Sequence, residues 1–249
     1  MNQTLLLFSA GIVGGVVNAV AGGATLITFP VMLMSGLPPV LANATNAIAI
    51  APGHWLAALA DRNKMPPLDR KLIGSLVVAF CAALVGAGLL LALPGETFML
   101  PVPALIGFAT VLFAAAPVLG RWSIQRRVSV AGKGALPALI LSSLYGGFFG
   151  AGLGILLSAV IAFGEPHDIR KVKVLKNLIA GSVSLAAVMV FVVKDAVIWV
   201  AAMPMLIGAL LGGYAGGHVN RWLPGWAVRA VVISTGVFMT VFYALRYWF

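Results

Sequence analysis

The chain has 249 residues, of which 61% are hydrophobic and only 9% are charged, and its mean hydropathy is +1.07. Because soluble domains carry about 25% charged residues, this composition excludes a soluble fold, and its apolar content excludes a disordered chain. Apolar runs without a charge reach about 18 residues or more, which is the length that a bilayer requires of a helix. We therefore predict an all-α polytopic membrane protein.

The net charge of +10 comes from basic residues in short clusters between apolar runs, where the positive-inside rule places them. No soluble module remains to present a basic face, so nucleic acid is not an expected partner. The single cysteine, Cys81, lies in an apolar run, which excludes an internal disulfide and thiolate metal sites. The N-terminal stretch has no basic region before its apolar run, so we expect it to belong to the fold.

Two kinds of apolar segment follow one another along the chain. Full spans, each about 18–22 residues long, alternate with two longer regions that glycines interrupt. In chain order these are the interrupted region Thr4–Gly36, the spans Val40–Ala60, Leu72–Leu93 and Val102–Leu119, the interrupted region Leu136–Gly164, and the spans Val172–Val193, Ala196–Tyr214 and Ala227–Leu245. Dividing the interrupted regions at their glycines leaves pieces that are short for a span, which favours broken or re-entrant helices.

The two interrupted regions and their following segments also resemble each other. Gly14-Gly15 matches Gly146-Gly147 at an offset of 132, and Thr45–Ala49 matches Lys176–Ala180 at an offset of 131. Three spans follow each interrupted region. We therefore expect one transmembrane domain built from two internal repeats, residues 1–120 and 121–249.

The basic residues indicate how the interrupted regions cross the membrane. If each region crossed once, the 16 basic residues would divide 10 to 6 between the two sides. If each forms a hairpin that returns to its own side, 14 lie on one side, and only Lys194 and Arg246 lie opposite. The second arrangement fits the positive-inside rule better, and it inverts the second repeat relative to the first with both termini outside. Inverted repeats with broken helices are typical of secondary transporters.

The acidic residues argue against an enzyme. All six lie in loops or at the ends of spans, so no carboxylate pair is available inside the membrane for acid–base chemistry. Small polar residues instead gather near the two glycine breaks. We expect no catalytic residue, no cofactor and no metal site.

Helix breaks expose backbone N–H groups, and the start of a half-helix carries partial positive charge, so an anion can bind there. We place a small anionic substrate between the two repeats, near the breaks at Ala21–Ala24 and Gly150–Gly154. The predicted binding residues are Asn18, Gly22, Gly23, Thr45, Asn46, Gly150, Gly152, Gly154, Lys176 and Asn177. The alternative for the glycines is that they let helices pack closely.

Two titratable side chains each have two interpretations. Lys176 stands one to two turns inside its span, where it either supplies charge to the substrate or extends its ammonium to the membrane surface. His54 is the one histidine within a predicted span. It is a candidate for proton coupling, and the alternative is a packed, hydrogen-bonded histidine.

Two glycine-rich blocks resemble those of a known family. They read Gly11-x-x-Gly14-Gly15-x-x-Asn18-Ala19-x-Ala21-Gly22-Gly23, followed by Pro30, Gly36 and Ala42-x-Ala44-Thr45-Asn46, and then Gly146-Gly147-Phe148-Phe149-Gly150-Ala151-Gly152-x-Gly154. This combination resembles the sulfite exporter TauE/SafE family, also called the 4-toluene sulfonate uptake permeases, over essentially the whole chain. The resemblance implies a multi-pass carrier of the bacterial inner membrane for sulfur-containing anions such as sulfite or organosulfonates.

An anion channel and a carrier of a small non-sulfur organic anion remain the alternatives. The expected partners are the anionic substrate and the lipid bilayer, and a homodimer stays open.

The distribution of basic residues makes a testable prediction of topology. Single cysteines that replace Lys64, Arg126 and Glu165 should resist an impermeant thiol reagent in intact cells, whereas one that replaces Asp195 should react. Labelling of positions 64 and 165 from opposite sides would contradict the hairpin arrangement.

Overall fold

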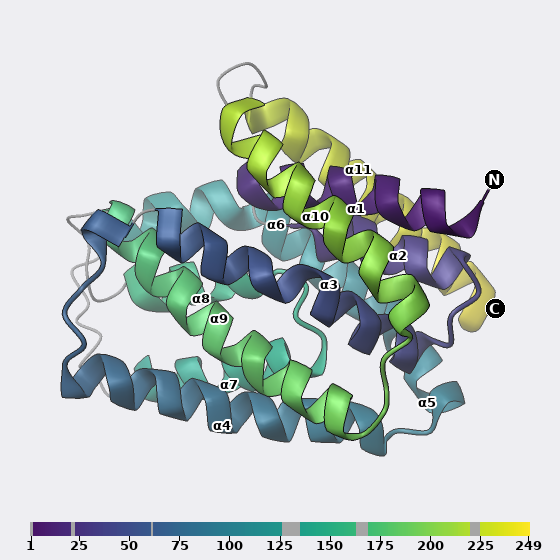
Figure 1. Cartoon of the computed structure of the whole chain (residues 1–249), viewed down its shortest axis with the longest axis horizontal. Helices are drawn as coiled ribbons and strands as arrows, with labels where there is room; N and C mark the ends of the chain where they lie inside the picture. Colours follow the sequence, from purple (N-terminus) through teal and green to yellow (C-terminus); the bar gives the residue numbers. More distant parts are fainter. Residues whose placement is uncertain (1, 21–22, 61, 126–134, 163–168, 220–224) are drawn as a thin grey trace.

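A computed structural model describes the chain except for residues 1, 21–22, 61, 126–134, 163–168 and 220–224. Every element in the described residues is a helix, which confirms the predicted all-α fold (Figure 1). The elements are α1 (Gln3–Val20), α2 (Thr25–Met34), α3 (Pro39–Ala60), the 3-10 helix η1 (Arg62–Lys64), α4 (Arg70–Ala92), α5 (Gly95–Met99), α6 (Val102–Gln125), α7 (Ala135–Phe148), α8 (Leu153–Ala162), α9 (Ile169–Val193), α10 (Trp199–Val219) and α11 (Gly225–Tyr247).

Five described helical stretches are long and apolar enough to cross a membrane. They are Arg70–Ala92, Gly95–Val118, Val172–Val193, Trp199–Gly216 and Trp226–Tyr247. Each overlaps a predicted span. The remaining predicted span, Val40–Ala60, forms the 22-residue helix α3, but its polar side chains keep it less apolar than the other five. The protein is therefore a polytopic membrane protein, and α3 is the predicted span that falls short of the hydropathy typical of a membrane crossing.

Three local details differ from the prediction. The span expected from Ala196 begins as a helix only at Trp199, because the end of α9 closes in a turn around Asp195. Asp195 adopts a φ of 51°, and the Ala196 N–H donates to the Phe191 carbonyl at 2.9 Å, which is the usual way to satisfy the last carbonyls of a helix. The short helix α5 was not predicted, and Gly154, predicted within a break, belongs to the first turn of α8.

Both interrupted regions are broken where the sequence predicts. α1 ends at Val20 and α2 begins at Thr25, and we call the stretch between them break 1. α7 ends at Phe148 and α8 begins at Leu153, and we call residues 149–152 break 2. With 18 residues, α1 is longer than the predicted half-helix, whereas α2 and α8 have only 10 residues each.

Figure 1 shows both chain termini at one end of the molecule, together with the turn from α9 to α10. We call this the terminal end. The end of α3 and the beginnings of α4 and α9 lie at the left of the view, and the end of α10 and the beginning of α11 lie at its top, all away from the termini. We call this side of the molecule the basic end. The basic residues on these segments are Arg62, Lys64, Arg70, Lys71, Arg170, Lys171, Lys173, Lys176 and Arg229. Lys194 and Arg246 belong to the terminal end, so the described charges are strongly polarised along the helices.

Contacts between helices follow the same pattern in the two halves of the chain. α1 packs along α10, and α7, which is the equivalent of α1 in chain order, packs along α4. α3 contacts α10 as α9 contacts α4, while α3 also contacts α9, and α6 also contacts α11. This correspondence supports the proposal that residues 1–120 and 121–249 are two repeats.

Glycines allow the closest of these approaches. A Cβ on Gly11 or Gly15 of α1 would overlap a backbone carbonyl oxygen of α10, and one on Gly212 would overlap the Ile12 carbonyl oxygen. In the other half, a Cβ on Gly86 would overlap the Leu144 carbonyl oxygen. Small residues at helix interfaces are the main means of close packing in membranes, where lipid supplies no hydrophobic drive. These four glycines therefore serve close helix packing.

Two glycines of α4 test this role against each other. Gly86→Ala should destabilise the protein by about 1–3 kcal/mol, because the added methyl group forces two backbones apart. Gly88 is exposed, with no heavy atom within 4 Å of a Cβ position, so Gly88→Ala should leave Tm unchanged or slightly raised. Thermal unfolding of the purified protein in detergent measures both. Equal shifts for the two variants would contradict glycine-mediated packing of α4 on α7.

Candidate functional site

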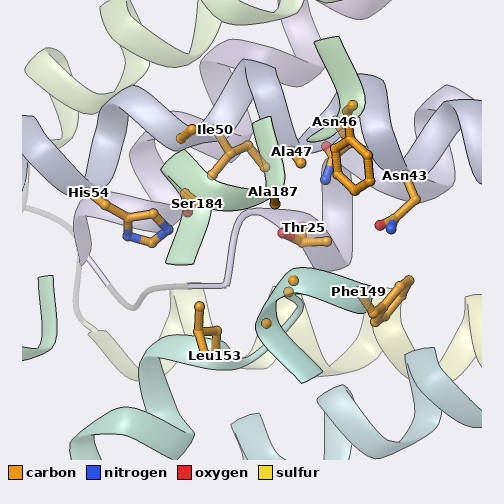
Figure 2. Close-up of a pocket in the computed structure, with 15 residues that line it drawn as sticks. Thr25, Asn43, Asn46, Ala47, Ile50, His54, Phe149, Leu153, Ser184 and Ala187 are labelled. Carbon is orange, nitrogen blue, oxygen red and sulfur yellow. The ribbon is translucent and has the colours of Figure 1, made fainter. Parts of the chain in front are cut away.

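A cavity of about 40 Å³ lies among α3, α9, break 2 and the start of α2. A water molecule needs about 10–15 Å³ of such space, so the cavity has room for a few waters or one small ion. Figure 2 shows the side chains that line it. The polar ones are Thr25, Asn43, Asn46, His54 and Ser184, and the larger apolar ones are Ile50, Phe149, Leu153 and Phe191. Among the described lining residues there is no carboxylate and no lysine or arginine.

One face of α3 forms much of the polar wall. Asn43, Asn46, Ile50 and His54 follow one another at three- or four-residue intervals, so they share a face of the helix. The same stretch carries the polar residues that keep the hydropathy of α3 below that of a typical membrane crossing. Its polarity is therefore concentrated at the cavity.

Two polar residues of α3 bond to the ends of other helices. The Asn43 side-chain nitrogen donates to the carbonyl of Phe148, the last residue of α7, at 2.9 Å. The Thr45 hydroxyl accepts a hydrogen bond of 3.1 Å from the N–H of Ile198, just before α10. Helix ends leave N–H and carbonyl groups without intrahelical partners, and these two side chains supply the missing bonds. Thr45, predicted to bind substrate, thus holds α10 in place.

Asn46 differs from its two neighbours. Its side chain is only 2% exposed, yet its amide oxygen has no hydrogen-bond partner among the described residues. Figure 2 shows the amide of Asn46 pointing toward the cavity, on the side where Thr25 lies. A buried amide without a partner costs free energy, and native proteins almost always satisfy one with protein, water or ligand. The Asn46 amide is therefore available to form hydrogen bonds with a molecule or ion in the cavity.

Break 2 forms the opposite wall and is held rigidly. Gly150 and Gly152 have φ values of 76° and 77°, which favour glycine over any residue with a Cβ. The Tyr145 hydroxyl donates to the Ala151 carbonyl at 2.7 Å. The Phe149 ring packs edge-on against the Phe29 ring of α2, with 5.2 Å between the ring centres. The break thus presents a fixed backbone surface to the cavity.

Lys176 lies beside break 2. Its Nζ is 3.9 Å from the Cβ position of Gly154, in the first turn of α8, and its ammonium is close enough to interact electrostatically with His54. The start of a helix already carries partial positive charge, and a lysine there adds a full one. Because no described carboxylate lines the cavity, the environment between Lys176 and the start of α8 favours an anion.

The predicted binding residues are only partly brought together. Asn46, Gly150 and His54 line the cavity, and Lys176 and Gly154 meet beside break 2. The others lie outside the lining. The Asn18 side-chain nitrogen faces Gly53, Gly23 lies against Phe113, Asn177 is buried in α9, Gly152 packs toward Ala109 and Leu112, and Gly22 is outside the described residues.

Three polar lining residues were not among the predicted binding residues. Thr25 and Asn43 belong to the small polar residues that gather near the breaks in the sequence, so that clustering was the available signal. Ser184 follows Asn177 by seven residues, which is two helical turns and therefore the same face of α9. Helical spacing from Asn177 was the signal that points to Ser184.

Crossing helices around a polar cavity, with two broken helices beside it, are typical of membrane transporters. The chain belongs to the sulfite exporter TauE/SafE family, whose sequence profile matches residues 7–243. The resemblance seen in the two glycine blocks is thereby confirmed.

Curated relatives match over nearly the whole chain. A probable membrane transporter protein of Haemophilus influenzae is 28% identical over 94% of this chain and 92% of its own length. The probable membrane transporter protein YfcA of Escherichia coli K12 is 26% identical over 94% of this chain and 87% of its own. The probable membrane transporter protein ORF9 of a Sinorhizobium species is 26% identical, with 94% and 90% covered. No solved structure matches the chain.

Variants of two adjacent residues of α3 distinguish a polar side chain that stabilises the fold from one that is available to a ligand. Thr45→Val removes the acceptor of the half-buried Ile198 N–H and should cost about 1–3 kcal/mol of stability. Asn46→Leu replaces a buried, unpartnered oxygen with apolar atoms of similar volume, so Tm should stay the same or rise. Thermal unfolding in detergent without added anions measures both. An equal loss of Tm in Asn46→Leu would show that protein groups already satisfy the Asn46 amide.

Proposed function

We propose that this protein is a secondary transporter that carries a small sulfur-containing anion, such as sulfite or an organosulfonate, and binds it in the cavity between α3 and break 2. The observation that carries the proposal is Asn46, a buried side chain that points into that cavity and whose Oδ1 has no partner among the described residues. The Nδ2 of the same amide is the donor that would meet an oxyanion. The two polar neighbours of this residue, Asn43 and Thr45, are engaged with helix ends, which leaves Asn46 for the substrate.

The electrostatics of the site support an anion. Lys176 and the start of α8 both place positive charge beside the cavity, and the lining contains no described carboxylate to oppose it. The groups that meet the anion directly are neutral amides and hydroxyls. Such donors hold an oxyanion without a full counter-charge, so the anion can also leave, as a transport cycle requires.

The proposal that the transported anion contains sulfur is based on membership of the family. The family description names sulfite export, whereas the relatives' names state membrane transport without a substrate. Sulfite and sulfonates present several acceptor oxygens within a small volume, which suits a compact cavity lined by donors. A carrier of a non-sulfur organic anion is the alternative within the same site.

Transport by alternating access would use the two halves of the chain. Paired contacts such as α1 with α10 and α7 with α4 support inverted repeats that rock around the cavity. By the positive-inside rule we assign the basic end to the cytoplasm of a bacterial cell and both termini to the outside of its inner membrane. All the described residues that line the cavity come from one chain, so each subunit of a homodimer would contain its own complete site.

His54 is the candidate for proton coupling. It lines the cavity about two helical turns beyond Asn46 on the same face of α3 and interacts with Lys176, whereas no described carboxylate is present there. If the carrier is proton-coupled, the proton travels on His54, on Lys176 or on the anion itself. Loss of the pH dependence of transport in His54→Gln, with anion binding intact, would assign it to the histidine.

Exchange of labelled sulfite across proteoliposomes tests the proposed site. Asn46→Leu and Lys176→Gln should each raise the half-saturating concentration about tenfold or more, because each removes a hydrogen bond or charge interaction with an anion, worth about 1.5–3 kcal/mol. The matched control is Lys173→Gln, an exposed lysine one turn nearer the basic end of α9, which should retain wild-type exchange. Ohmic current without saturable exchange would indicate the alternative, an anion channel.

The two site variants also separate the roles of their residues. Wild-type exchange in both would mean that the anion binds elsewhere. Wild-type exchange in Lys176→Gln alone would mean that this lysine only extends toward the membrane surface, with Asn46 still a ligand.

A further inference from the structure

A second basic side chain, Arg229 near the start of α11, points into the protein rather than toward the membrane surface. α11 packs antiparallel to α6, with Gly236 against Thr110 and Gly107 against Thr240. This register places Arg229 level with Pro117 of α6. Its guanidinium carbon nevertheless lies 6.0 Å from the centre of the Phe113 ring, one helical turn deeper. An arginine that only anchored the helix at the surface would extend in the opposite direction.

Phe113 connects this guanidinium to break 1. The ring is 1% exposed, and its Cε2 atom lies 2.6 Å from the Cβ position of Gly23, so it packs directly on the backbone of the break. Two residues later, Thr25 lines the cavity that contains Asn46. Arg229, Phe113, Gly23 and Thr25 therefore form a continuous series of contacts and chain neighbours from the basic end to the cavity.

The Arg229 side chain also lacks a partner. Its Nε is buried and has no hydrogen-bond acceptor among the described residues, and no described carboxylate pairs with the guanidinium. The contact with Phe113 is a favourable cation–π arrangement, but it supplies no hydrogen-bond acceptor for the buried Nε. A guanidinium at membrane depth is costly, so one that is retained there usually has a functional partner.

We propose that Arg229 is a second anion contact, on the basic-end side of break 1, which the transported oxyanion occupies on its way between the aqueous phase and the cavity. The guanidinium has parallel N–H groups that match two oxygens of a sulfite or sulfonate group, a fit that a lysine does not offer. With Lys176 beside break 2, each break would then have one basic side chain of its own. This inference rests on the proposed function, because it takes the same anion as its ligand.

The test compares two arginines of the same helix. Arg229→Gln and the control Arg246→Gln each remove one guanidinium that lies over an aromatic ring, since Arg246 lies over Tyr247 at 5.9 Å but at the terminal end. Sulfite exchange is measured in proteoliposomes of uniform orientation with substrate added to either face. Arg229→Gln should raise the half-saturating concentration at least tenfold at the face of the basic end and much less at the other. Arg246→Gln should match the wild type at both.

Arg229→Lys protects the test against a variant that does not fold. It keeps the charge and the stem but loses Nε and the paired N–H groups, so a rise of a few fold is expected. The proposal is overturned if either Arg229 variant has the wild-type half-saturating concentration for sulfite added at the face of the basic end. The proposal is equally wrong if the variants lose only stabilisation by anionic lipid, because a lipid headgroup would then be the ligand.

A second measurement keeps this inference distinct from the proposed function. If the wild type transports sulfite and Arg229→Gln is unaffected, the proposed function stands and the role of Arg229 falls. If the wild type transports no sulfur anion, the substrate assignment fails. Thermal stabilisation by sulfite, thiosulfate, phosphate and acetate then tests Arg229 independently. If one of these anions stabilises the wild type and Arg246→Gln but not Arg229→Gln, the result supports an anion contact at Arg229. If Arg229→Gln is stabilised as much as the wild type, the proposal is overturned.

Discussion

Backbone groups inside a bilayer have no water to bond, so every interruption of a helix there must be satisfied by the protein itself. This constraint organises the centre of the molecule. Break 2 ends α7 at Phe148, whose carbonyl accepts from Asn43, and the Tyr145 hydroxyl serves the Ala151 carbonyl within the break. Of the polar residues of α3, Asn43 satisfies the end of α7 at break 2, whereas Thr45 satisfies the N–H of Ile198 just before α10. The same concentration of polar side chains is the basis of the proposed anion site.

Close helix packing provides the rigid frame around these breaks. Glycines of α1 and α10, and of α4 and α7, bring backbones within contact, which is the main source of helix association in lipid. The two glycine-packed pairs flank the central crossing of α3 and α9. Rigid pairs on either side of a polar centre are well suited to move as bodies, which is what alternating access requires. Packing glycines and break glycines therefore have different structural roles.

Positive charge reaches the polar centre from one end of the protein. Lys176 meets the start of α8, and Arg229 lies over the ring that packs on break 1. Each side chain comes from a helix that begins at the basic end, where the positive-inside rule explains basic residues in general but not their inward direction. An anion approaching from that end would meet cationic groups first and neutral amides afterwards. Such an order attracts the anion without trapping it in the cavity.

Much of the architecture could be predicted from the sequence, because membrane depth imposes helix length and apolar composition directly. Five of the six predicted spans, both helix breaks and the family all follow from hydropathy, glycine positions and motif. The roles of Asn43, Thr45 and Asn46 did not follow, since three polar residues on one turn look equivalent until their partners are known. Only the tertiary structure decided that Phe148 and Ile198, more than 100 residues away, engage two of them and leave the third facing the cavity. The inward direction of Arg229 likewise depends on how α11 packs against α6. Nothing in the sequence indicates that these two helices, which are separated by about 100 residues of chain, are in contact.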